Sequence, residues 1–171
     1  MLRALALSVT VAAIAMSNSV IAAADPQPLP TTYAIGKCIS AEQPAQPEPE
    51  RFDYNCDSTG VLQDMVWTSW DAKGAKGKGT DDSLECQPNC AQGTRLTNPV
   101  VVHAWNPQPA ASSSKCPRGF LFYTDMTIAY PDGVPPWIKP DTTWDVGTDF
   151  VTIDGMPAVH FSGMKPNCRL F

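Results

Sequence analysis

The stretch FLFYTDMTIAY, residues 120–130, decides the fold of this chain. Its side chains alternate between two sets, with Phe120, Phe122, Thr124, Met126, Ile128 and Tyr130 in one and Leu121, Tyr123, Asp125, Thr127 and Ala129 in the other. Successive side chains of a β-strand point to opposite faces of its sheet, so an alternation of this length predicts a long strand.

Five more strands are predicted around this one. Residues 150–153 and 156–161 flank Asp154-Gly155, a pair that suits a two-residue hairpin turn with positive φ. Pro157 cannot donate a hydrogen bond to a neighbouring strand, so we expect residues 156–161 at an edge of the sheet. Three further strands are predicted over Gly60–Trp70, Ala75–Leu84 and Val100–Trp105.

The chain as a whole shows the pattern of an all-β protein. No stretch after residue 24 has good helical periodicity, and 17 prolines and 11 glycines are spread along the 171 residues. We therefore expect a single disulfide-bonded antiparallel β-sandwich or small barrel over residues 51–171.

The N-terminal residues 1–24 have the features of a secretory signal peptide. Arg3 supplies the positive charge, residues 4–16 form the apolar region, and Ala22, Ala23 and Ala24 supply a cleavage site. An uncleaved membrane anchor is the alternative, but the apolar region is short and a small-residue site follows it. We expect cleavage after Ala24 and a secreted protein, either extracellular or in the cell envelope.

Residues 25–50 differ in composition from the rest. They hold six prolines, at positions 26, 28, 30, 44, 47 and 49, and residues 42–50 are polar and acidic as well. This composition favours an extended, solvated chain. We expect an exposed arm that Cys38 alone ties to the domain.

Charge and hydropathy exclude two classes of function. Asp and Glu number 17 against 12 Lys and Arg, a formal net charge of −5. A general nucleic-acid binder needs clustered basic residues, so we expect no nucleic-acid partner. The chain after residue 24 has no apolar run of 18 residues, so we expect no transmembrane segment in the mature protein.

Six cysteines in an exported chain indicate disulfide bonds. Cys86 and Cys90 enclose Pro88 and Asn89, which favour a tight turn, so we expect a local Cys86–Cys90 bridge. Their spacing fits neither a zinc site nor a thiol oxidoreductase. The other four, Cys38, Cys56, Cys116 and Cys168, allow three pairings.

The middle of the chain resembles a group of small exported actinobacterial proteins that have no assigned activity. The shared motifs are Trp-x-x-Trp at 67–70, Ala-x-Gly-x-Gly-Thr at 75–80 and Cys-x-Pro-x-Cys-Ala-x-Gly at 86–93, followed by Cys116 and the aromatic strand. The group often has a Cys-x-Asp-Gly motif at this point of the sequence. In this chain Ser58 and Thr59 separate Cys56-Asp57 from Gly60. The resemblance spans residues 54–131 and implies export and a β-rich, disulfide-bonded module.

This resemblance also implies a disulfide pairing. The group typically has equivalents of Cys56, Cys86, Cys90 and Cys116. With Cys86 bound to Cys90, it implies a Cys56–Cys116 bridge and leaves Cys38 to pair with Cys168.

Few residues offer catalytic chemistry. His103 and His160 both lie in predicted strands, every cysteine has a bridge partner, and no Gly-x-Ser-x-Gly motif is present. Residues 73–80 lack the Gly-Lys-Ser/Thr ending of a phosphate-binding loop and favour a lysine-bearing edge strand or hairpin. Asp141, Asp145 and Asp149 recur every four residues, without an EF-hand pattern, and are expected to be solvated loop charges. We expect no metal and no cofactor.

The tryptophans give the one indication of binding. Trp67 and Trp70 lie three apart in a strand, so we expect them on opposite faces. Trp137 and Trp144 lie in a loop rich in Pro and Asp, where they form either lids on the core or an exposed platform for a ligand. We expect Trp144 to be the lid and Trp137 to be the more exposed ring, and Trp137, Trp144 and Asp145 are the candidate ligand contacts.

The sequence thus predicts an exported, non-enzymatic module that binds a cell-envelope or host component, such as a glycan or a protein. The alternatives are a small secreted hydrolase that uses an acidic pair and a secreted inhibitor of hydrolases.

Overall fold

The computed structural model describes residues 31–86, 88–111, 115–166 and 168. The predicted signal peptide, residues 1–24, lies outside these residues. The described residues contain no helix and form nine β-strands: β1 Thr32–Ile35, β2 Phe52–Asp53, β3 Gly60–Asp71, β4 Gly74–Leu84, β5 Arg95–Pro109, β6 Phe120–Ala129, β7 Thr142–Asp145, β8 Thr148–Ile153 and β9 Met156–Phe161. The all-β prediction is confirmed, as are the six predicted strands, but the lysine-bearing strand β4 lies between β3 and β5 and not at an edge.

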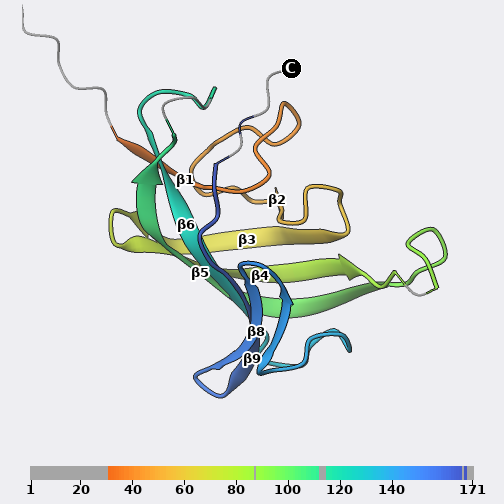
Figure 1. The fold of residues 1–171 in the computed structure, drawn as a ribbon. Helices are drawn as coiled ribbons and strands as arrows, with labels where there is room; N and C mark the ends of the chain where they lie inside the picture. Colours follow the sequence, from red (N-terminus) through yellow and green to blue (C-terminus); the bar gives the residue numbers. More distant parts are fainter. Residues whose placement is uncertain (1–30, 87, 112–114, 167, 169–171) are drawn as a thin grey trace, which may run out of the picture.

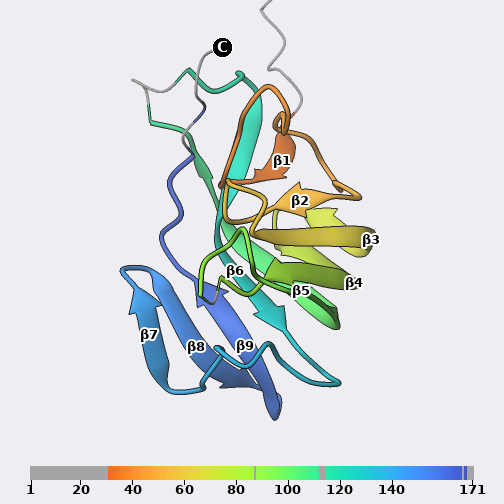
Figure 2. The same ribbon diagram turned by 90° about the vertical axis from the view of Figure 1, so that its right-hand side faces the viewer.

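All nine strands belong to one sheet, in the order β2-β3-β4-β5-β6-β9-β8-β7, with β1 beside β6. Every pair is antiparallel except β1 with β6. The sheet curls like half of a barrel, with β2, β3 and β4 on one side of β6 and β7, β8 and β9 on the other (Figures 1 and 2). Neither end of this order pairs with the other.

The central strand β6 changes partner along its length. Its first half pairs in parallel with β1, where Ile35 lies beside Tyr123. Its second half pairs with β9, where Met126 lies beside Phe161. Between these two segments Thr124 and Asp125 have no strand partner on that edge, while β5 runs along the other edge. Both sets of alternating side chains of β6 include fully buried residues, because Phe122 packs with Ala34 and Ile39 whereas Tyr123 belongs to the main core.

The β8–β9 hairpin forms as predicted, but β9 is not an edge strand. Asp154 and Gly155 have φ values of 50° and 79°, which suits a two-residue turn between twisted strands. The strand β9 lies between β8 and β6. Pro157 is tolerated there because it lies at the end of the ladder with β6, one residue before Ala158, which is opposite Ala129. Its carbonyl still accepts a hydrogen bond of 2.9 Å from the N–H of Tyr130, so only the reciprocal bond of this last rung is missing.

Trp67 and Trp70 lie on the same face, which corrects the prediction of opposite faces. The register of β3 against β4 shifts between Trp67 and Ser69, so an extra residue there reverses the alternation. The two rings consequently meet edge to face, with centroids 4.6 Å apart. Gly77 of β4 lies beneath Trp67, where a Cβ would come within 2.7 Å of the ring.

The predicted exposed arm is in part a strand of the sheet. Ala34 and Ile35 of β1 are buried, and the Trp70 indole donates a hydrogen bond of 2.9 Å to the carbonyl of Tyr33. The Trp67 indole donates likewise to the carbonyl of Pro49. Cys38 is therefore not the only tether. Residues 41–48 are mostly exposed and without strand structure, as their composition predicts.

The disulfides are Cys38–Cys56, Cys86–Cys90 and Cys116–Cys168, and no described cysteine is free. The local Cys86–Cys90 bridge is confirmed. The pairings Cys56–Cys116 and Cys38–Cys168, implied by the family resemblance, are wrong.

The observed pairing follows from how the arm docks. Gln43, in the arm, bonds the carbonyl of Cys38 and both backbone groups of Asp53, which holds the segment after β1 against the β2–β3 loop that carries Cys56. Cys116 and Cys168 both pack against the small cluster of Ala34, Ile39 and Phe122. The bridges therefore fasten the arm and the C-terminal segment separately.

Candidate functional site

A cavity of about 670 Å³ opens between the two sides of the half-barrel. This volume lies within the range of roughly 300–1,000 Å³ that is typical of small-molecule sites. The lining comes from four places: the β2–β3 loop, the end of β4 with the residues after it, the end of β6 with its following loop, and β8 with β9. It comprises Tyr54, Asn55, Asp57, Thr59, Ser83, Leu84, Glu85, Cys86, Tyr130, Pro136, Trp137, Ile138, Lys139, Thr148, Phe150, Val159 and Phe161.

A buried carboxylate lies behind the lining. Asp81 of β4 is 0% exposed and accepts three hydroxyl hydrogen bonds. Tyr54 donates to Oδ1 at 2.8 Å, and Tyr130 and Ser83 donate to Oδ2 at 2.9 and 3.0 Å. These three donors also line the cavity, so they connect Asp81 to it.

Burial shifts the acid–base behaviour of this group. It raises the pKa of Asp81 above the ordinary value, while the hydrogen bonds from Tyr54, Tyr130 and Ser83 act in the opposite direction. Burial also raises the pKa of both phenols well above 10, with the nearby Asp81 charge adding to the effect. The phenols therefore remain neutral donors at physiological pH.

The raised pKa of Asp81 predicts a pH dependence of stability. The folded chain binds a proton at higher pH than the unfolded chain, so the stability due to Asp81 is full below the unfolded pKa and is lost as the pH rises through the folded pKa. We expect wild type to gain stability relative to Asp81→Asn as the pH is lowered from about 7 to about 3. Urea denaturation of both proteins across this range measures the difference. A difference that is constant or shrinks towards low pH would contradict the raised pKa.

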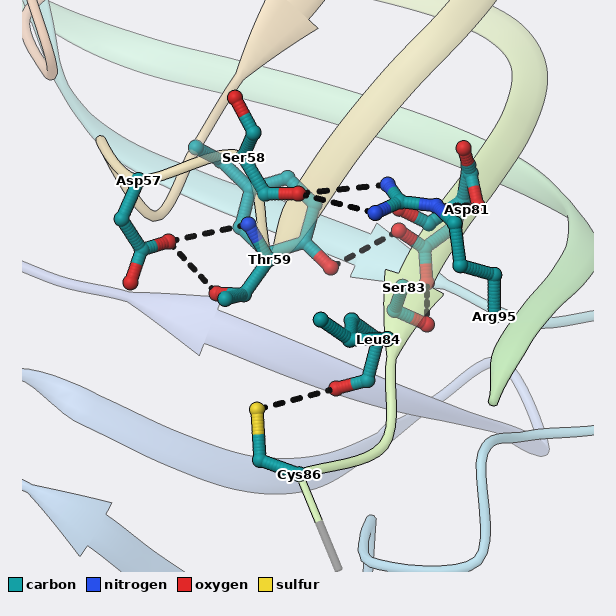
Figure 3. A network of polar contacts seen from close by, with 10 residues as sticks. Asp57, Ser58, Thr59, Asp81, Ser83, Leu84, Cys86 and Arg95 are labelled. Atoms are coloured by element: carbon teal, nitrogen blue, oxygen red, sulfur yellow. Dashed lines mark hydrogen bonds and ion pairs between the residues drawn. The ribbon is translucent and has the colours of Figure 1, made fainter. Parts of the chain in front are cut away.

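Arg95 does not neutralise Asp81. It forms an ion pair with the neighbouring Asp82, with Nε 2.8 Å from Oδ1, and its terminal nitrogens donate to the carbonyl of Ser58 (Figure 3). Ser58 belongs to the β2–β3 loop, so Arg95 fastens this loop to β4 and β5. Among the described residues no cation is hydrogen-bonded or ion-paired to Asp81.

The β2–β3 loop is held by its own acidic residues. Asp53 accepts hydrogen bonds from the backbone N–H groups of Asn55, Cys56 and Ser58. Asp57 accepts from the backbone N–H and the hydroxyl of Thr59, as Figure 3 shows. The loop thus brings the Asp57 carboxylate to the cavity, with Glu85 contributed from the end of β4.

Of the three predicted ligand contacts, the structure places one, Trp137, at the cavity. Trp137 lines the cavity, is half-buried and packs against the core. Trp144 and Asp145 lie in β7, and their side chains lie outside what the structure describes. Asp149 is not among the lining residues; it accepts a hydrogen bond from Thr143.

Both histidines lie away from the cavity, in a ring stack on the sheet. His103 and Trp105 of β5 stack with centroids 4.9 Å apart, and His160 of β9 stacks on Trp105 at 5.5 Å. Burial, and then the charge of Lys76, lowers the pKa of His103. Because both partners of Trp105 stack on it, this indole offers no open platform for a ligand.

The Asp81 network was missed from the sequence, although a signal was present. Along β4 the small residues Ala75, Gly77 and Gly79 alternate with Lys76 and Lys78. If the same alternation of inward and outward residues continues along the strand, Asp81 and Ser83 fall on the buried side, and the structure places them there. An acidic residue at a buried position of a strand marks a polar network.

The described residues hold no cluster of three or more metal-binding side chains. No helix among them is long and apolar enough to span a membrane. Comparisons with protein-family models, curated proteins and solved structures find no match to this chain.

Proposed function

We propose that this protein is an exported, non-enzymatic module whose cavity binds a small molecule of the cell envelope or of a host. The observation that carries the proposal is the cavity of about 670 Å³, whose lining includes five aromatic side chains and in which Tyr54, Tyr130 and Ser83 converge on Asp81. A concave site of this size that combines aromatic side chains with convergent polar groups is the usual form of a small-molecule site.

Export is supported by the charged, apolar and small-residue regions of residues 1–24, by the three disulfides and by the resemblance to exported actinobacterial proteins. We propose an extracellular or envelope location. Intact mass of the protein recovered outside the cell tests this, with a mature chain beginning at Asp25 as the expected result.

Binding without catalysis is supported by the roles of the nucleophilic and basic groups. The hydroxyl of Ser83 is engaged with Asp81, and His103 and His160 belong to the stack with Trp105. Among the described residues the cavity therefore brings no histidine to a serine hydroxyl, the arrangement that activates such a nucleophile.

The neutral probe 4-phenylbutan-1-ol tests the binding site by saturation-transfer NMR. Thr148 lines the cavity, so Thr148→Trp fills it, whereas Thr152 is exposed on the same strand outside the lining. We expect transfer to the probe in wild type and in Thr152→Trp, and loss of it in Thr148→Trp. Absence of transfer in wild type, or equal transfer in all three proteins, would overturn the proposed site. Turnover of nitrophenyl glycosides by wild type would contradict the non-enzymatic role.

A further inference from the structure

We propose that the cavity selects an organic cation, that is, a protonated amine or quaternary ammonium attached to an apolar group. This inference rests on the proposed function and adds to it the chemical class of the ligand. Three properties of the described residues support it: the aromatic wall, the sign of the charges around the cavity and the orientation of the hydroxyl hydrogens at Asp81.

Five aromatic side chains line the cavity: Tyr54, Tyr130, Trp137, Phe150 and Phe161. The face of an aromatic ring carries partial negative charge and attracts cations, with Trp and Tyr the stronger partners. One ring of this set already does so within the folded chain, because Nζ of Lys37 lies 4.1 Å from the centroid of Phe161. The wall therefore offers an ammonium group favourable contacts that a neutral group lacks.

The charges around the cavity favour the same sign of ligand. The lining contains the carboxylates Asp57 and Glu85 and the cation Lys139, and Lys37 beside Phe161 is a second cation at the cavity. Asp81 adds a third carboxylate directly behind the lining, and the guanidinium of Arg95 is paired with the neighbouring Asp82. An anionic ligand would enter a site of its own charge.

The hydrogen bonds at Asp81 determine whether the hydroxyl groups of Tyr54 and Tyr130 can donate to a ligand or only accept from it. Tyr54 and Tyr130 each have one hydroxyl hydrogen, and each donates it to Asp81. Their oxygens are left only with lone pairs for a ligand. An ammonium N–H that donates to such a phenol extends a chain of hydrogen bonds towards the buried carboxylate, and each bond in a chain of this kind strengthens the next. A ligand with only acceptors gains nothing from these groups.

Isothermal titration calorimetry with three probes of one skeleton tests the inference: 4-phenylbutylamine, 4-phenylbutan-1-ol and 4-phenylbutyrate at neutral pH and low ionic strength. We expect the amine to bind wild type about ten-fold more tightly than the alcohol, since one cation–π contact in a partly desolvated site can supply about that factor. We expect the carboxylate to bind more weakly than the alcohol. If the alcohol binds as tightly as the amine, or the carboxylate binds best, the inference fails while the proposed function stands. If none of the three binds, the proposed function fails as well.

Variants locate the source of the preference. Asp81→Asn keeps the size of the side chain and removes its charge, so we expect the affinity advantage of the amine over the alcohol to fall several-fold, and circular dichroism of the variant checks that it folds. Glu85→Gln removes a charge of the lining and should weaken the amine alone, whereas Glu50→Gln, exposed and outside the lining, should not. If neither Asp81→Asn nor Glu85→Gln reduces the affinity ratio of amine to alcohol, these carboxylates are not the source of the preference and the inference is wrong on this point.

Discussion

Replacing Tyr123 with alanine is expected to lower the free energy of unfolding by about 3–5 kcal/mol, the usual cost of deleting a buried aromatic ring. Tyr123 is fully buried in β6 at the point where β1 docks. Its ring stacks on Tyr33 with centroids 5.8 Å apart and meets Trp70 edge to face at 5.5 Å. The substitution therefore removes the contacts that attach the N-terminal strand to the sheet.

The matched variant Tyr123→Phe keeps the ring and removes one hydrogen bond, the one of 2.7 Å that the hydroxyl donates to the carbonyl of Asp71. We expect it to cost about 1 kcal/mol. Urea denaturation followed by circular dichroism measures both variants. Equal losses for the two would show that the hydroxyl, and not the ring stack, carries the stability.

Removing the Cys116–Cys168 bridge is expected to be the most costly loss among the disulfides. In the chain-entropy model the cost grows with the length of the closed loop. The sequence separations of 52, 18 and 4 residues give upper values of about 4 kcal/mol for Cys116–Cys168, about 3 for Cys38–Cys56 and about 2 for Cys86–Cys90.

Paired serine variants, Cys116→Ser with Cys168→Ser and the two equivalent pairs, test this order by urea denaturation under non-reducing conditions. Peptide mapping of the wild type without reduction checks the pairing itself. A peptide that joins Cys56 to Cys116 would contradict the structure. A Cys86–Cys90 double variant that is the least stable of the three would contradict loop entropy as the dominant cause.

The strands could be predicted because each depends on its own alternating pattern. The segment 120–130, the Asp154-Gly155 turn and the β3–β4 hairpin are specified by neighbours in sequence, and all three form. A period of two also distinguishes inward from outward residues, as Lys76 and Gly77 show in β4.

The failed predictions depended on contacts between distant segments. The bulge near Trp67 comes from the register of β3 against β4, which the strand's own pattern does not contain. The parallel docking of β1 on β6 decides which cysteines meet, and a Pro-rich composition gave no sign of it. The position of β9 between β6 and β8 likewise follows from sheet order and overrides the local meaning of Pro157.

The candidate site was the least predictable part. Trp137 was identified from its residue type, but the cavity arises where a loop after β2, the end of β4 and the β8–β9 hairpin converge. Asp81 was overlooked because adjacent Asp81 and Asp82 resemble solvated charges. One is in fact buried with Tyr54 and Tyr130, and the other faces Arg95 at the surface.

The order of strands has a consequence for self-association. An unpaired strand edge is a template on which another chain can add a strand, and long flat edges favour aggregation. Within the described residues the outermost strands β1, β2 and β7 have only four, two and four residues, and the long strands β4, β5 and β6 have strand neighbours on both sides. The exception is β3, whose outer edge pairs with β2 only at Val61 and Leu62, so its remaining residues up to Asp71 have no strand partner on that side. The outer edge of β3, and not β4, β5 or β6, is therefore where another chain could add a strand.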